Sequence, residues 1–152
     1  MRVEDWTEGH AGEVAGWHYE PPYDFYDLAS DPADEAAMRD PARAEHFRAV
    51  LADGDEWLDA FWYFDWHRDV VEVGIGLRPD LTGRGHGESF LSAQLAYAAE
   101  SWHPAAFRLF VAAWNERAIR LYERFGFRET GRETRRFELV GEHEFLRMER
   151  PA

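Results

Sequence analysis

The chain has 152 residues and a mass of 17.7 kDa, the size of a single domain. Hydrophobic side chains make up 45% of it and cysteine is absent, so we expect a packed globule without disulfides, a cysteine nucleophile or thiolate-held metals. The net charge of −13 repels phosphate backbones and argues against nucleic acid as a partner.

The first part of the chain is acidic and irregular. Residues 1–60 hold sixteen acidic and four basic side chains, whereas residues 61–152 hold fourteen and thirteen. We expect a short helix around residues 10–17. Loops and short helices should follow over residues 18–37, because proline and aspartate interrupt regular structure. The acidic part either attracts a cation or only forms a solvated surface.

Three strands are predicted next, over residues 46–52, 57–66 and 70–77. Their side chains are mostly apolar, aromatic or β-branched, and short turns at residues 53–55 and 67–69 separate them. In the third strand, apolar side chains alternate with Glu72, Gly74 and Gly76. Three such strands in succession predict an antiparallel meander.

The second half changes to a helical period. A helix is expected over residues 88–102, a strand over 107–112, a helix over 115–125, and two strands over 127–133 and 142–149. Asn115 is the expected N-cap of the second helix, and Gly126 the residue that ends it. This order predicts one α+β domain (residues 1–152) with a mixed, mostly antiparallel sheet flanked by helices on both faces.

Residues 77–88, LRPDLTGRGHGE, join a strand to a helix through three glycines at a spacing of two. Glycines let successive backbone N–H groups point into one concavity, and a helix N-terminus adds partial positive charge. Such a turn suits a pyrophosphate, and Arg84 adds a full charge. The pattern lacks the endings of a P-loop and of a dinucleotide fingerprint, so an ordinary glycine turn remains the alternative.

A second motif follows as Asn-x-x-Ala-x-x-x-Tyr-x-x-x-Gly-Phe, from Asn115 to Phe127. Together with the Gly-x-Gly turn after a strand, it resembles the GCN5-related N-acetyltransferase (GNAT) family over residues 46–149. The family usually has Gln or Arg three residues before Gly85, where this chain has Thr82. A hydroxyl can still bond a phosphate oxygen, so we expect a site with weaker charge complementarity.

The resemblance implies acetyl-CoA as co-substrate. The seven histidines lack metal-ligand spacing, so we expect no metal. It implies that the pantetheine arm pairs with the end of the strand at residues 70–77 and that the pyrophosphate lies on the glycine turn. Gly74 and Gly76 then allow close approach of a ligand, or form a β-bulge. The implied cofactor-binding residues are Ile75, Gly76, Leu77, Thr82, Gly83, Arg84, Gly85, His86, Gly87, Glu88, Asn115 and Tyr122.

Direct attack of an amine on the thioester suits a chain without cysteine, with a backbone N–H near residues 75–77 for the oxyanion. The resemblance makes Tyr122 the general acid for the thiolate, although a core aromatic is the alternative. Glu72 is the predicted base, with Asp59 and Asp65 as rivals. His86 is expected to be a solvated loop residue.

The resemblance also places the acceptor side in residues 1–45. Aromatic and acidic side chains there suit a cationic primary amine of a small molecule or peptide, unless the aromatics only close the core. Three functions remain open: an active N-acetyltransferase, an inactive acetyl-CoA-binding sensor or regulatory module of the same fold, and a different fold. A homodimer is reasonable by resemblance. No apolar run reaches the ~20 residues of a membrane helix, so we expect no membrane partner and a cytoplasmic location.

Overall fold

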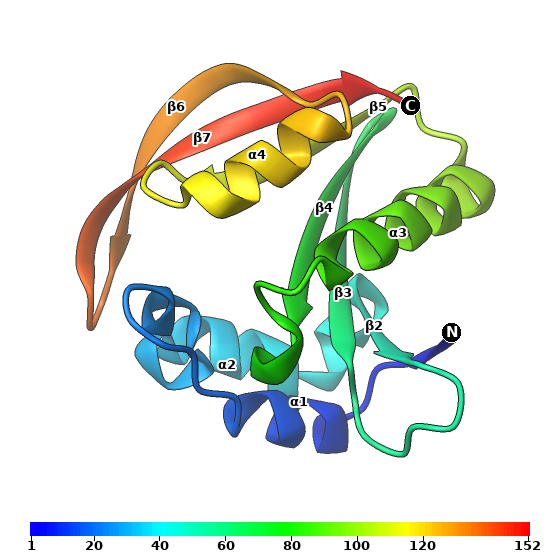
Figure 1. Cartoon of the computed structure of the whole chain (residues 1–152), viewed down its shortest axis with the longest axis vertical. Helices are drawn as coiled ribbons and strands as arrows, with labels where there is room; N and C mark the ends of the chain where they lie inside the picture. Colours follow the sequence, from blue (N-terminus) through cyan, green and yellow to red (C-terminus); the bar gives the residue numbers. More distant parts are fainter.

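The computed structural model describes residues 1–152 and is built on one seven-stranded sheet (Figure 1). Every neighbouring pair of strands is antiparallel except β4 and β5, which are parallel. The strands lie in the spatial order β1 (Arg2–Asp5), β2 (Phe47–Leu51), β3 (Ala60–His67), β4 (Val70–Leu77), β5 (Ala106–Ala112), β7 (Gly141–Pro151) and β6 (Arg128–Phe137). The predicted mixed, mostly antiparallel sheet is therefore confirmed.

Helices cover both faces of this sheet and enclose two hydrophobic clusters (Figure 1). The helices are α1 (Glu8–Ala15), α2 (Pro32–Arg39), α3 (His86–Trp102) and α4 (Glu116–Arg124). Helices α1 and α2 pack on one face, and α3 and α4 on the other. Strand β3 alternates accordingly: Trp62 and Phe64 point toward α3, whereas Phe61 and Tyr63 point toward α1 and α2. Both of its faces are thus apolar, as predicted for an inner strand.

The structure differs from the predicted elements mainly in the N-terminal part. Strand β1 was not predicted, because Val3 is the only apolar side chain in its four residues and it pairs only at the edge of the sheet. Helix α1 begins two residues early, since the Thr7 side chain caps it by accepting from the backbone of His10. Strand β3 begins at Ala60, and Trp57 lies before it, 67% exposed.

The β4–β5 pair is the feature that positions the site. It extends over only three residue pairs, from Val70 with Ala106 to Glu72 with Arg108, and the strands then diverge. On its other edge β4 pairs with β3 in continuous register along all eight residues, so the predicted bulge alternative at Gly74 and Gly76 is wrong. The far half of β4 consequently has one edge without a strand partner.

Candidate active site

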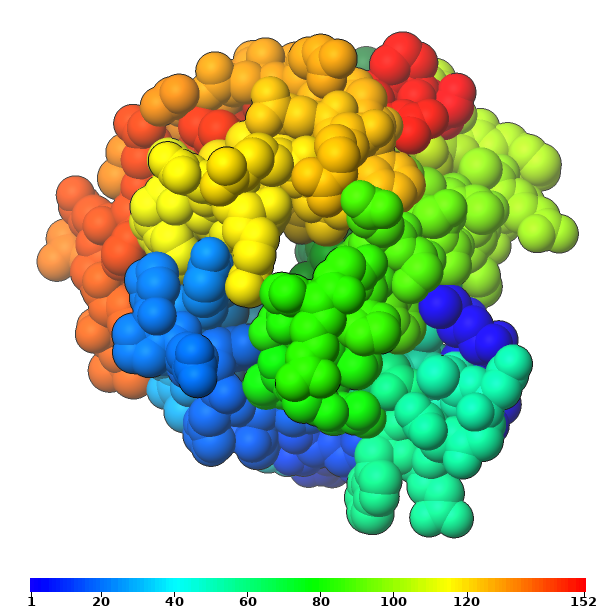
Figure 2. All heavy atoms as spheres, in the orientation of Figure 1, coloured from blue at the N-terminus to red at the C-terminus, as the bar shows by residue number.

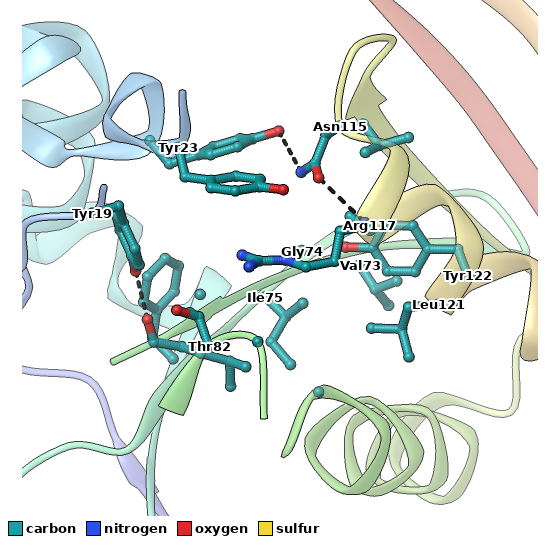
Figure 3. A pocket seen from close by; sticks show the side chains of 18 of the residues that line it. Tyr19, Tyr23, Val73, Gly74, Ile75, Thr82, Asn115, Arg117, Leu121 and Tyr122 are labelled. Carbon is teal, nitrogen blue, oxygen red and sulfur yellow. Dashed lines mark hydrogen bonds between the residues drawn. The ribbon is translucent and has the colours of Figure 1, made fainter. Parts of the chain in front are cut away.

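A cavity of about 380 Å³ lies in the gap between β4 and β5 (Figure 3). Its lining comes from the far half of β4, the glycine turn, α4 and the segment between α1 and α2. In Figure 2 the surface is hollowed where the N-terminal segment, the glycine turn and α4 meet. Three regions that are far apart in sequence, namely the N-terminal segment, the stretch from β4 through the glycine turn, and α4, therefore enclose one space.

The edge of β4 forms one wall of this cavity. The Arg78 amide donates to the Asp59 carbonyl on the β3 side at 2.8 Å. Hydrogen-bonding direction alternates along an antiparallel strand, so Leu77 and Ile75 direct their backbone groups to the opposite, unpaired edge. The Leu77 carbonyl already accepts from the Tyr19 hydroxyl at 2.6 Å. This edge can therefore pair with an extended ligand.

Packing against β3 explains the glycine at position 76 of β4, which the sequence alone did not explain. A Cβ on Gly76 would lie 2.1 Å from the ring of Phe61, its partner on β3. A Cβ on Gly74 would meet Tyr63 at an ordinary 3.4 Å. Gly76 thus makes room for a neighbouring aromatic ring of the protein itself, and Gly74 is under little such constraint.

The glycine turn forms the second wall. Gly83 and Gly85 have φ angles of +71° and +80°, which favour glycine, and both line the cavity. Gly85 is the N-cap of α3 and has no side chain to accept from the first N–H groups of the helix. Those donors remain free, as a pyrophosphate site requires.

The other predicted residues of the turn are arranged unequally. Gly87 lines the cavity but also lets α3 approach α4, because a Cβ there would lie 3.1 Å from Leu121. The Thr82 hydroxyl lines the cavity and donates to the Pro79 carbonyl at 2.7 Å. Arg84 and His86 are exposed and do not belong to the lining.

Arg117 is a cavity residue that the sequence analysis missed. It lies on the first turn of α4, and its guanidinium points across the cavity toward the glycine turn (Figure 3). A Cβ on Gly83 would be 3.3 Å from Nη1 of Arg117. The guanidinium stacks 4.0 Å from the ring centroid of Tyr23 and forms no ion pair. It places a positive charge in the cavity, which the neutral Thr82 does not provide. In the sequence, only its position two residues after the N-cap Asn115 could have indicated that it lies near the site.

Asn115 and Tyr122 lie on the α4 wall, as the second motif predicts. The Asn115 Oδ1 accepts from the Ala118 amide at 3.2 Å, which confirms the N-cap, and its Nδ2 donates to the Tyr26 hydroxyl at 3.0 Å. The Tyr122 hydroxyl points into the cavity (Figure 3). Burial, with a smaller effect of Tyr26, raises the pKa of Tyr122, so its hydroxyl stays protonated at neutral pH.

The predicted base and its rivals lie outside the cavity lining. Glu72 is beside Asp65 on β3, and His67 Nε2 lies 3.5 Å from Glu72 and 3.3 Å from Asp65. Burial raises the pKa of Glu72, and His67 opposes the change. Asp59 is 2% exposed, accepts from a backbone amide and pairs with Arg78 at 3.1 Å, so it holds the loop before β3.

Residues of the N-terminal segment form a further wall of the cavity, and Tyr19 lies beside Thr82 of the glycine turn (Figure 3). Tyr19, Tyr23 and Tyr26 line it, and Tyr23 and Tyr26 pack against Trp114 at the start of α4. Trp17, in contrast, is buried in the core beneath α1. The aromatic side chains that this segment contributes to the cavity lining are therefore its tyrosines.

A family model described as an acetyltransferase (GNAT) domain matches residues 4–128. The chain belongs to the GCN5-related N-acetyltransferase family. Among solved structures, a GNAT acetyltransferase from Bacillus anthracis is 13% identical with a TM-score of 0.75, over 98% of this chain and 93% of that one. A spermidine N-acetyltransferase from Vibrio cholerae, described as dodecameric, is 20% identical with a TM-score of 0.69, over 99% and 92%. No curated protein matches the chain in sequence.

Two structural absences bear on this GNAT domain. No group of three or more His, Asp or Glu side chains is arranged to hold a metal ion. None of the helices combines the length and the apolar character needed to cross a membrane.

Proposed function

We propose that the chain transfers an acetyl group from acetyl-CoA to a primary amine of a small molecule or peptide. The observation that carries this proposal is the cavity in the β4–β5 gap, where an unpaired strand edge, a glycine turn with free N–H donors and the Tyr122 hydroxyl face one space. Family membership supports acetyl transfer in general terms.

In this proposal the donor lies along the cavity from the glycine turn to α4. The pyrophosphate accepts from the backbone of residues 83–88, with the Arg117 guanidinium beside Gly83. The pantetheine arm extends β4 along its free edge at residues 75–77. The acetyl group then comes to lie near Tyr122.

The chemistry needs an oxyanion donor, an acid and a base. A free backbone N–H of β4 stabilises the oxyanion of the tetrahedral adduct. Tyr122 protonates the departing thiolate, and its raised pKa keeps the required proton in place at neutral pH. Glu72 was predicted as the base; because it lies outside the cavity lining, a water would have to carry the proton to it.

The acceptor is proposed to be a cationic amine. The tyrosines and acidic side chains of the N-terminal segment favour an ammonium group by cation–π contact and charge. The structurally similar spermidine N-acetyltransferase makes polyamines one reasonable class.

Thiol release from acetyl-CoA, measured with a panel of polyamines, aromatic amines and peptide N-termini, tests the proposal. We expect release of CoA thiol only when an amine is present, and mass spectrometry should detect the N-acetylated amine as the second product. Acetyl-CoA binding without release from any amine would contradict transfer and favour the sensor or regulatory module instead.

A further inference from the structure

A second cavity, of about 220 Å³, adjoins the first on the face of the sheet that carries α2. Four aromatic rings, three aspartates and Arg135 line it. Only Tyr26 and Asp34 belong to the lining of both cavities. The two spaces therefore meet at one hydroxyl and one carboxylate, and the Tyr26 hydroxyl is already held by Asn115.

Of the four carboxylates that line the two cavities, three have partners. Asp27 accepts from a backbone amide at 2.9 Å, and Asp31 caps α2 by accepting from the amide of Asp34 at 3.2 Å. Glu88 pairs with Arg124 at 3.0 Å. The carboxylate of Asp34 has no hydrogen bond and no ion pair. It is the one acidic group at this junction that is free to meet an incoming cation.

We propose that Asp34 holds the ammonium group of the acceptor where the two cavities meet and takes up its proton, a role that rests on the proposed acetyl transfer. The acceptor is a primary amine on a slim apolar or aromatic body that lies among the rings of the second cavity. An ammonium between a carboxylate and aromatic faces gains both charge pairing and cation–π contact. Asp34 is on α2 and was not among the residues predicted from the sequence.

The surroundings of Asp34 suit a group that exchanges a proton near neutral pH. Asp34 is an exposed residue whose side chain lines both cavities, so water reaches its carboxylate. Partial desolvation by the cavity walls raises its pKa from 3.8 to about 6; Asp31 raises it further and Arg43 lowers it. The charged and titratable groups that face it are Asp31 at the start of α2, Arg43 before β2, Tyr63 on β3, Tyr26 and Asp27 between α1 and α2, and Arg135 on β6.

Arg135 does not cancel the negative charge of the second cavity. Its guanidinium pairs with Glu133 at 2.6 Å and lies over the rings of Phe110 and Phe145, 4.4 and 4.9 Å from their centroids. The cavity therefore presents an unpaired carboxylate between aromatic walls, which favours a cation over an anion.

One N–H bond of the ammonium breaks and its proton passes to a carboxylate oxygen of Asp34. The freed electron pair forms the N–C bond to the thioester carbonyl, and the C–S bond then breaks with its electrons on sulfur. The thiolate takes a proton from Tyr122, which is replaced by the second N–H proton of the adduct. Asp34 later loses its proton to water.

Amine binding without acetyl-CoA tests the contact independently of turnover. The probes are spermidine and 2-phenylethylamine at millimolar concentration, and the readouts are thermal stabilisation and the carboxyl ¹³C titration of labelled aspartates. We expect either amine to stabilise the wild-type chain and to lower the pKa of Asp34. Asp34→Asn should lose the stabilisation. Glu35→Gln is the matched control, because it removes one charge from the same helix, pairs only with Arg39, and lines neither cavity.

The pH dependence of kcat/KM tests proton uptake. We expect the wild-type rate to rise through about pH 6, and Asp34→Asn to lose this limb with about a 100-fold lower kcat/KM. Glu35→Gln should stay within about twofold. Loss of the limb in Glu72→Gln with retention in Asp34→Asn would overturn the proposal.

The two possible failures have different signatures. Amine stabilisation that is unchanged in Asp34→Asn, or an Asp34 signal that does not respond to either amine, overturns the role of Asp34 even if the wild-type chain turns over. Absence of thiol release from every amine refutes the proposed transfer, while the binding readouts still decide whether Asp34 meets the amine.

Discussion

Substitution of Gly76 by alanine should force a clash with Phe61. A Cβ there would lie 2.1 Å from Cε1 and 2.5 Å from Cζ of the Phe61 ring. Carbon atoms in contact require about 3.5–4.0 Å, so the ring must move by more than about 1 Å. Trp6 and Trp17 pack against this ring, with centroids 6.0 and 6.2 Å away, so it can move only toward the cavity that it lines.

The cost of this displacement can be estimated. Overpacking of a filled core typically costs about 1–3 kcal/mol. We expect the free energy of unfolding of Gly76→Ala to fall by about 2 kcal/mol, which lowers the Tm by about 4–8 °C in a domain of this size. Gly74→Ala is the matched control on the same strand and face. Its Cβ would meet Tyr63 at 3.4 Å, so we expect a change within about 0.5 kcal/mol.

Urea unfolding of both variants, with acetyl-CoA affinity measured by calorimetry, checks this estimate. Phe61→Leu in the Gly76→Ala background should recover part of the lost stability, because the smaller side chain vacates the space that the ring occupied. Equal losses in Gly74→Ala and Gly76→Ala, or no recovery with Phe61→Leu, would refute the packing explanation. A loss of affinity without loss of stability would favour ligand approach as the reason for this glycine.

Four further predictions concern side chains of the site and its frame. Tyr122→Phe should lower kcat about 100-fold with little change in acetyl-CoA affinity, and an unaltered rate in single-turnover assays would remove Tyr122 from the mechanism. Arg117→Gln should weaken acetyl-CoA binding about tenfold at low salt, whereas Arg120→Gln on the same helix should weaken it less than about twofold. Calorimetry should show that the difference in Kd between wild type and Arg117→Gln decreases as salt is raised. Because the pKa of Asp34 is raised from 3.8 to about 6, the folded chain keeps this proton between pH 3.8 and about 6, whereas the unfolded chain has released it. The wild-type chain therefore loses stability as pH rises through this range. Discounted for the water at this site, Asp34→Asn should be about 1 kcal/mol more stable than wild type at pH 7 and equally stable near pH 4; wild-type and variant stabilities that run parallel over this pH range would contradict this prediction. Asp59→Ala should cost about 3 kcal/mol in urea unfolding by leaving Arg78 without its buried partner, and a specific loss of kcat at unchanged stability would instead restore Asp59 as a candidate base.

Features that depend on local patterns could be predicted from the sequence. Alternation along β4 and the apolar stripe of α4 are short-range signals, and Asn115 and Gly126 bound α4 as expected. Glycines with positive φ in the turn before α3 are also local. These features were sufficient to predict the meander, the order of the second half and the cavity wall around Gly85.

Features that depend on distant neighbours could not be predicted in this way. Tyr26 meets Asn115 across 89 positions of the chain. Asp34 is a candidate for amine binding only because the fold places it at the junction of the two cavities. The alternation along β4 predicted on which face of the sheet Glu72 lies. It could not show that Asp65 and His67 of β3 lie beside the Glu72 side chain.

The central claim is that the β4–β5 gap binds acetyl-CoA through the glycine turn. Isothermal titration of the wild-type chain with acetyl-CoA, paired with thermal unfolding, tests it most directly. We predict that one acetyl-CoA binds per chain. At a free coenzyme concentration about 100 times Kd, the free energy of unfolding should rise by about 2.7 kcal/mol, and Gly85→Val should abolish this increase. Neither heat nor a rise in Tm at saturating coenzyme, across temperature and salt, would contradict the claim.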